Sequence, residues 1–104
     1  MESTSPPATK IIPVPVPAIQ HEGTYTYVAV KGSLYASDSA VFGLSKEEET
    51  ALANRFATDS DKIVGGVMIK NHPIKVINTL SQLGYKVVSS TGEAEVVWTM
   101  QREV

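Results

Sequence analysis

The chain has 104 residues, 42% of them hydrophobic, with no cysteine and a net charge of −2 from nine basic and eleven acidic side chains. This length allows one domain with one modest core, and the lack of cysteine excludes disulfides, thiol catalysis and thiolate metal sites. No run of Lys or Arg supplies the concentrated positive charge that a nucleic-acid surface or an anionic membrane surface requires, so neither is an expected partner. The apolar runs are too short for a membrane span or a secretory signal, and we therefore expect a soluble protein of the cytoplasm or the nucleus.

Five of the six prolines lie within the first 17 residues, and residues 1–22 show neither a helical nor a strand period. The sequence predicts that this Pro-rich N-terminal extension is disordered and that residues 23–104 form a single domain. The run from Ile11 to Pro17 also has the composition of a polyproline ligand, but a solvated tail explains it better.

The first strand is predicted over residues 25–31, with its two tyrosines and Ala29 on one face. Both of its faces are apolar, which is typical of a central strand or of one that meets a neighbouring subunit. Gly32 is expected to end or kink this strand. A short second piece is expected to follow it at Leu34 and Tyr35.

A capping box formed by Ser45 and Glu48 predicts the start of the first helix, which continues to about residue 57. Three glutamates in its first turn suit the positive end of the helix dipole. They point in different directions around the helix and cannot converge on one metal ion, so we expect them to be solvated. Residues 59–61 predict a closing turn. One strand is then expected over residues 63–69, interrupted by a bulge at its two glycines.

Pro73 suits the first turn of a second helix, with Asn71 or His72 as its cap, and Gly84 suits its end. An apolar stripe about 100° wide follows this helix and contains Ile74, Val76, Ile77, Leu80 and Leu83. Residues 85–90 and 94–101 predict two strands joined by a reversal at residues 91–93. We expect this helix and hairpin to form the folding core.

The predicted order of elements is strand, helix, strand, helix, strand, strand. Such an order favours an α+β domain in which a mainly antiparallel sheet is covered on one face by two helices.

Signatures of catalysis are absent from the sequence: it has no Gly-rich phosphate loop, no His-x-x-x-His pair and no Gly-x-Ser-x-Gly elbow. His21 and His72 are expected to be structural. We therefore predict that the protein is not an enzyme and uses no cofactor or metal ion.

The second hairpin carries candidate recognition residues around its reversal, namely Thr91, Gly92, Glu93, Glu95, Val96 and Trp98. Free backbone donors and a carboxylate beside a large aromatic ring suit a small zwitterion or the loop of a partner. The alternative interpretation, which the sequence favours, is that Trp98 belongs to the core and the glutamates are only exposed.

About a quarter of the chain resembles the C-terminal half of the GTP cyclohydrolase I feedback regulatory protein family. The family carries a helix ending in Leu-x-x-x-Gly-[Phe/Tyr], followed by Val-x-Ser-x-Thr-Gly and then by Val-Trp. The matching residues, in the same order, are Leu80, Gly84, Tyr85, Val87, Ser89, Thr91, Gly92, Val97 and Trp98.

This resemblance implies a non-enzymatic regulator that assembles as a ring-like homopentamer and docks on the faces of decameric GTP cyclohydrolase I. It also implies feedback inhibition by tetrahydrobiopterin and stimulation by phenylalanine in the complex. Docking is expected through the turn of the second hairpin and through the region of Leu34 and Tyr35. The sequence departs from the family pattern at Glu93-Ala94-Glu95, which stands in place of a Gly-Gln segment, and an acidic side chain there would repel a ligand carboxylate.

Two other functions stay open at this point. One is a free-standing small-molecule sensor that binds an amino acid at a subunit interface. The other, which is less favoured, is an enzyme that acts through Glu93 or Glu95.

Overall fold

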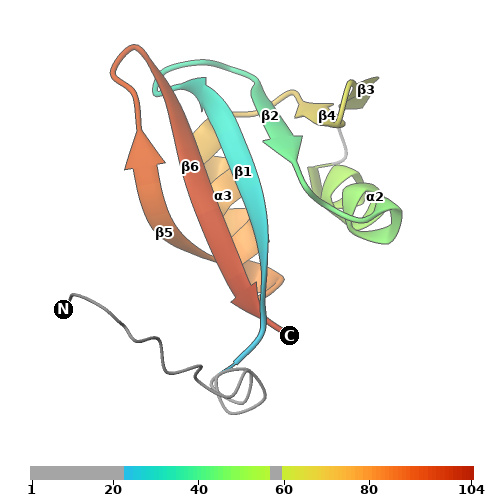
Figure 1. The fold of residues 1–104 in the computed structure, drawn as a ribbon. Coiled ribbons are helices and arrows are strands. Elements are labelled where there is room, and N and C mark those ends of the chain that lie inside the picture. The colour runs from blue at the N-terminus through green and yellow to red at the C-terminus, as the bar shows by residue number, and fades with distance from the viewer. Residues whose placement is uncertain (1–22, 57–59) are drawn as a thin grey trace, which may run out of the picture.

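The computed structural model describes residues 23–56 and 60–104 (Figure 1), so the predicted disorder of residues 1–22 lies outside the described residues. The described part contains eight elements in the order β1 (Tyr25–Ser33), β2 (Ser39–Phe42), α2 (Lys46–Phe56), β3 (Ser60–Ile63), β4 (Gly66–Ile69), α3 (Pro73–Gln82), β5 (Lys86–Thr91) and β6 (Glu95–Glu103). Neighbouring strands pair antiparallel in the order β3-β4-β2-β1-β6-β5. The predicted α+β class, with an antiparallel sheet and two helices, is confirmed.

The core lies between the sheet and the two helices. Figure 1 shows α3 behind β1 and β6, and the buried side chains of both helices join those of the strands in one cluster. The cluster contains Val28, Val30, Val41, Leu52, Val67, Ile69, Val76, Leu80, Tyr85 and Met100. Tyr25, Tyr27 and Ala29 share one face of β1, as predicted, and the structure shows that this face lies on the side without helices while the even residues face the core.

β1 continues through Gly32 to Ser33, so of the two expectations for Gly32, an end or a kink of the strand, the end is wrong. Gly32 pairs with Val96 in the sheet. Its special role is close approach, since a Cβ added at this position would lie 2.9 Å from Cγ of Pro73. Glycine thus allows the start of α3 to pack directly on the sheet. Leu34 and Tyr35 lie in the turn that follows and do not form a strand.

Two further elements differ from the prediction. β2 was not expected, since only four residues form it and polar residues precede it. β3 and β4 are two paired strands, joined by a turn at Val64 and Gly65, in place of one strand with a bulge. Ser60 and Asp61 belong to β3 and not to a closing turn; residue 59 lies outside the described residues. Polar side chains are compatible with β3 because it is an edge strand of the sheet.

Both helices begin where the sequence predicts. In α2 the capping box is formed in both directions, with the N–H of Glu48 donating to Oγ of Ser45 at 3.2 Å and the N–H of Ser45 donating to Glu48 at 3.3 Å. α3 begins at Pro73 with His72 as N-cap, although the side chain of His72 makes no capping hydrogen bond. Ile74 was expected in the apolar stripe, but it is 45% exposed because it lies on the outer side of the first turn.

β5 and β6 form the expected hairpin. Its reversal lies at residues 92–94, one residue later than predicted, because Thr91 still pairs with Val97. Gly92 has a φ of +108°, which a glycine adopts without the strain that a side chain would add. A register shift between Val87 and Ser89 marks a bulge in β5, the second edge strand of the sheet.

Candidate functional site

The eight candidate recognition residues lie at one end of the sheet. The pairing of β1 with β6 ends at Ser33 and Glu95, so the turn with Leu34 and Tyr35 lies beside the reversal at residues 92–94. Figure 1 shows these two loops next to each other at the top of the sheet. We call this region the loop end. The structure therefore brings together two segments that are about sixty residues apart in the sequence.

Candidate side chains at the loop end divide between the two faces of the sheet. Val96 pairs with Gly32 and Trp98 with Val30, which places both on the face that the helices cover. Thr91 pairs with Val97 on the opposite face. Glu95 lies there as well, with one carboxylate oxygen 3.8 Å from Nζ of Lys31. The candidates thus border a common edge of the molecule and do not line one cavity.

Exposure separates packing residues from available ones at the loop end. Trp98 is half-buried and packs against the hydrophobic core, in agreement with the structural interpretation. Tyr35 is 89% exposed, and Leu34, Glu93 and Glu95 are exposed as well. An exposed aromatic and an exposed aliphatic side chain beside two carboxylates can bind a partner surface by burying apolar area and by pairing charges.

The loop between β1 and β2 is held against the start of α3. Oγ of Ser39, which is buried, donates to the carbonyl oxygen of Asn71 at 2.7 Å. Nδ1 of His72 lies 2.6 Å from the carbonyl oxygen of Ala36. Because a carbonyl only accepts, Nδ1 carries the proton in this hydrogen bond. The second contact gives His72 a structural role, and together the two contacts hold the loop that carries Tyr35.

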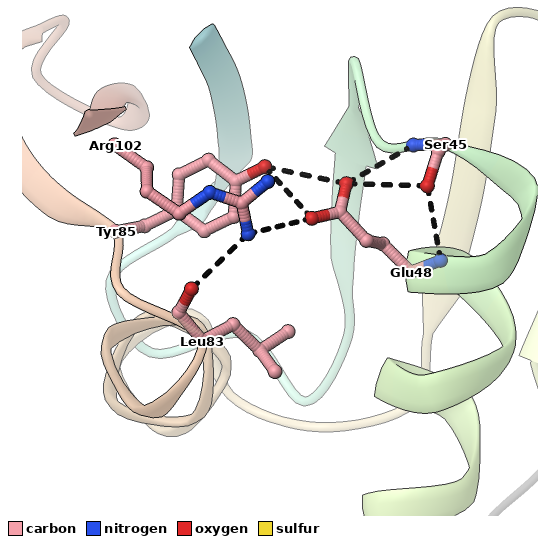
Figure 2. Close-up of polar contacts among 5 residues, drawn as sticks. All are labelled: Ser45, Glu48, Leu83, Tyr85 and Arg102. Atoms are coloured by element: carbon pink, nitrogen blue, oxygen red, sulfur yellow. Dashed lines mark hydrogen bonds and ion pairs between the residues drawn. The ribbon is translucent and has the colours of Figure 1, made fainter. Parts of the chain in front are cut away.

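A second polar cluster, which we call the Glu48 clamp, lies toward the opposite end of the sheet and consists of Ser45, Glu48, Leu83, Tyr85 and Arg102 (Figure 2). Nη1 of Arg102 is 2.7 Å from Oε2 of Glu48 and also donates to the carbonyl oxygen of Leu83 at 3.1 Å. The hydroxyl of Tyr85 donates to the same carboxylate at 3.2 Å, and the guanidinium lies 4.4 Å from the centre of the Tyr85 ring. The clamp joins α2, the end of α3 and β6.

The electrostatics of the clamp follow from these contacts. Partial burial opposes ionisation of Glu48, but the hydrogen bond from the N–H of Ser45 and the charge of Arg102 outweigh it and lower the pKa of the carboxyl. Burial and the neighbouring Glu48 carboxylate raise the pKa of Tyr85. At neutral pH the cluster therefore holds an ionised Glu48 and a protonated Tyr85. The prediction that the first-turn glutamates are solvated holds for Glu47 only. It is wrong for Glu48, which Arg102 and Tyr85 cover, and for Glu49, whose half-buried side chain pairs with Lys62.

Sequence reasoning found the Ser45–Glu48 box but missed its tertiary partners. The sequence did contain a signal for Arg102. Alternate residues of a strand share a face, so Arg102 lies on the same face of β6 as Trp98 and Met100, which places a cation on the core side. A buried cation requires an anionic partner. The sequence alone does not identify which glutamate supplies it.

A shallow hollow lies between α2 and β3, lined among others by Glu49 and Lys62, which already pair with each other at 3.2 Å. None of the eight candidates lines this hollow. In residues 23–56 and 60–104, no three His, Asp or Glu side chains are grouped as a metal site, and neither helix is long and apolar enough to cross a membrane.

The chain was also compared with models of protein families. The family model described as GTP cyclohydrolase I feedback regulatory protein (GFRP) matches residues 37–103. This range contains every described element from β2 to β6 and the second hairpin with its reversal, but it begins just after Leu34 and Tyr35. A comparison with individual curated proteins found no match.

Proposed function

The chain belongs to the GTP cyclohydrolase I feedback regulatory protein family, and we propose from this that it binds GTP cyclohydrolase I and regulates it without chemistry of its own. The family match across β2 to β6 is the observation that carries the proposal. The loop end adds physical support, because its exposed groups are suited to contact with another protein.

The loop end is the docking surface in this proposal. Tyr35 supplies the largest exposed apolar area there, and Leu34 lies next to it. The contacts of Ser39 and His72 hold the loop before binding, so that little conformational entropy is lost on association. Aromatic anchors of this kind supply much of the binding energy in protein interfaces.

We further propose a ring of five subunits, assembled through the two edges of the sheet. β3 and β5 are the outermost strands, and each presents backbone N–H and C=O groups that no neighbouring strand in the described chain takes up. Pairing of β5 in one copy with β3 in the next is a head-to-tail contact, which closes into a ring when the rotation per subunit fits. Five copies is the number that the family resemblance implies.

The most specific part of the proposal is that small-molecule effectors control the activity of the enzyme in the complex. Tetrahydrobiopterin would inhibit and phenylalanine would stimulate the enzyme by binding the complex more tightly in one of its states than in the other. Glu95 bears on phenylalanine, since its carboxylate lies beside Lys31, the cation that would otherwise attract the carboxylate of an amino acid. We therefore expect a weak stimulation by phenylalanine in the wild-type protein.

A binding assay with immobilised GTP cyclohydrolase I tests the proposal, with and without tetrahydrobiopterin or phenylalanine. We expect binding that depends on effectors, together with a pentamer in light scattering. Binding that no effector changes would refute regulation of this enzyme. A stable dimer that binds phenylalanine without the enzyme would favour the free-standing sensor instead.

Tyr35→Ala tests the docking surface, and Val64→Ala is its matched control. Val64 is as exposed as Tyr35 but lies in the turn between β3 and β4, away from the loop end. We expect Tyr35→Ala to weaken enzyme binding about tenfold, equivalent to about 1.4 kcal/mol, and Val64→Ala to leave it unchanged. Equal affinities of the two variants would remove the loop end from the interface.

Glu95→Gln tests the role of the acidic turn in the response to phenylalanine. The substitution keeps the size of the side chain and frees Lys31 from its 3.8 Å contact with a carboxylate. We expect stability near that of the wild type and a stronger stimulation by phenylalanine. An unchanged response would show that Glu95 is outside the effector site.

A further inference from the structure

The shallow hollow between α2 and β3 lies at one edge of the sheet, on the side that the helices cover. Its volume is about 290 Å³, and Ala53 of α2, Lys62 of β3 and Val67 of β4 are among the residues that line it. Lys62 pairs with Val67, which belongs to the hydrophobic core, so both side chains stand on the helix side of the sheet. Because β3 is the outermost strand, the hollow is next to the edge at which another strand can be added.

The charged groups of the hollow are already paired. The side chain of Glu49 is only 16% exposed, and its carboxylate accepts a hydrogen bond from Nζ of Lys62 at 3.2 Å. A charged ligand would have to break this pair, which is costly for a carboxylate that is largely buried. The methyl group of Ala53 and the alkyl stem of Lys62 are left for contact, and lysine stems pack well against apolar groups. An apolar side chain therefore fits the hollow better than an ion does.

β5, at the other edge of the sheet, carries apolar side chains of this kind. All six of its residues are exposed, and Val87 and Val88 are 43% and 46% exposed. Val87 pairs with Met100, which is buried in the core, so the side chain of Val87 also stands on the helix side. Val87 thus extends the apolar core to the edge of the sheet and leaves part of its surface in water.

The two edge strands run in opposite directions. Five antiparallel pairings separate β3 from β5, and each of them reverses the strand direction. Figure 1 shows the two strands at opposite sides of the sheet. When the sheet is continued from β5 of one copy to β3 of the next with the helices on the same side, these strands are therefore antiparallel.

The alternation of side chains along the strands determines which residues meet at such a contact. Val87 and Lys62 both stand on the helix side, so a register that keeps the helices on one side can place them opposite each other. On the other face Lys86 then lies diagonally from Asp61, which is within reach of a long side chain. Both of these side chains are exposed, although Asp61 already lies 3.6 Å from Lys70. The contact thus joins apolar groups on one face and opposite charges on the other.

We propose that the hollow receives Val87 of a neighbouring copy, with β5 of that copy paired antiparallel to β3 and Val87 opposite Lys62. This contact rests on the ring of subunits proposed above, and it names the side chains that join the copies. Backbone pairing alone leaves the register of two edge strands open, whereas burial of Val87 beside Ala53 and Val67 selects one register.

Cross-linking through engineered cysteines tests the register, because the chain has no cysteine of its own. Opposed residues on antiparallel strands have Cα atoms about 4.5–5.5 Å apart, a separation that a disulfide bridges. After oxidation, Lys62→Cys/Val87→Cys should give a ladder of covalent oligomers on a non-reducing gel. Each single variant should run as the monomer, since a head-to-tail contact does not bring two copies of one residue together. Covalent dimers of Val87→Cys alone, or no ladder from the double variant, would overturn the contact.

The matched control for the cross-link is Asp61→Cys/Val87→Cys. Asp61 is the neighbour of Lys62 in β3, but its side chain points to the opposite face of the sheet. This pair should cross-link much less than Lys62→Cys/Val87→Cys. Equal yields would mean that the edges meet without a fixed register, contrary to the proposal.

Complementary variants test the hollow itself by light scattering. Val87→Asp alters the inserted side chain, and Thr50→Trp fills the hollow, which Thr50 lines. Each variant alone should lower the mass from that of the ring to the 11.2 kDa of one chain. Their mixture should form a dimer, because one chain keeps an intact hollow and the other an intact Val87. Ile74→Asp, at a position of similar exposure on α3, should leave the mass unchanged.

Binding to GTP cyclohydrolase I, measured on the same variants, separates this contact from the proposed function. A wild-type ring that persists in both Val87→Asp and Thr50→Trp, while the enzyme is still bound, would overturn the contact and leave the regulatory role intact. Two variants that lose the ring but form no dimer on mixing would also overturn it, because intact partner surfaces would then fail to join.

Discussion

The Glu48 clamp should be a main determinant of stability, and Glu48→Ala tests it directly. The substitution removes the acceptor for Arg102, the acceptor for the hydroxyl of Tyr85 and half of the capping box with Ser45. These contacts tie α2 to the end of α3 and to β6, so their loss should loosen the packing of α2 as a whole.

The expected cost follows from the individual contacts. A charge-assisted hydrogen bond contributes about 1.5–3 kcal/mol when buried, but the side chains of Arg102 and Glu48 are 28% and 21% exposed, which lowers the contribution to about 1 kcal/mol. The capping interaction adds about 0.5–1 kcal/mol. Leaving the Tyr85 hydroxyl without its acceptor adds about 0.5–1 kcal/mol. We expect the free energy of unfolding to fall by about 2–3 kcal/mol, which lowers the melting temperature by about 10–20 °C in a domain of this size.

Urea and thermal unfolding, followed by circular dichroism, measure this loss. Glu47→Ala is the matched control, because Glu47 lies in the same helical turn but is exposed. It should change the free energy of unfolding by less than about 0.5 kcal/mol, apart from a small helix-dipole effect. If Glu48→Ala costs no more than Glu47→Ala, the contacts of the clamp contribute nothing net and the reasoning is wrong.

Three further outcomes are expected. The pKa of Glu48 is lowered from 4.5. The stabilisation that the ionised Glu48 carboxylate provides is therefore complete above about pH 5 and is lost as the pH falls through the folded-state pKa. Urea midpoints measured between about pH 6 and about pH 3 should fall in this way in the wild type, and Glu48→Gln should make the midpoint depend less on pH. Gly92→Ala should destabilise by about 2 kcal/mol or more in urea unfolding, because the residue keeps a positive φ and its Cβ would overlap the carbonyl oxygen of Glu95; a loss below about 0.5 kcal/mol would show that the reversal relaxes freely. Trp98→Ala should cost about 2–3 kcal/mol in the same assay, less than for a fully buried ring, since Trp98 is half-buried; a cost below about 1 kcal/mol would mean that the ring is not part of the core.

Local signals in the sequence were sufficient for much of this fold. The start of α3 at Pro73, its end before Gly84 and the pairing of β5 with β6 depend on residues close together in the chain, and they were predicted. The capping box at Ser45 was predicted for the same reason. Each of these features is determined by backbone preferences within a few residues of the chain.

The missed features depend on contacts between distant residues. A glycine such as Gly32 is typical of the end of a strand. In the structure it continues the strand, since its lack of a Cβ lets the side chain of Pro73 pack closely against the sheet. The polar sequence of β3 is typical of a turn, yet β3 pairs with β4 at the edge of the sheet. Polar residues are tolerated there because one edge of the strand stays in contact with water. Arg102, the cation of the Glu48 clamp, lies 54 residues from Glu48 in the sequence, and no local pattern specifies that pairing. The six hairpin candidates are neighbours in the chain, but the division of their side chains between two faces of the sheet follows from the register with β1.

The position of the clamp relative to the loop end allows stability and binding to be tested separately. β1 and β6 pair over nine positions, from Tyr25 and Glu103 at one end to Ser33 and Glu95 at the other, a separation of about 26 Å at about 3.3 Å per residue. Arg102 lies at the first end and the proposed docking surface at the second. A variant such as Glu48→Gln should therefore lower stability while leaving the affinity for GTP cyclohydrolase I unchanged at temperatures where the domain stays folded. If it weakened binding under those conditions, α2 would have to contact the enzyme itself, and the docking surface would extend beyond the loop end.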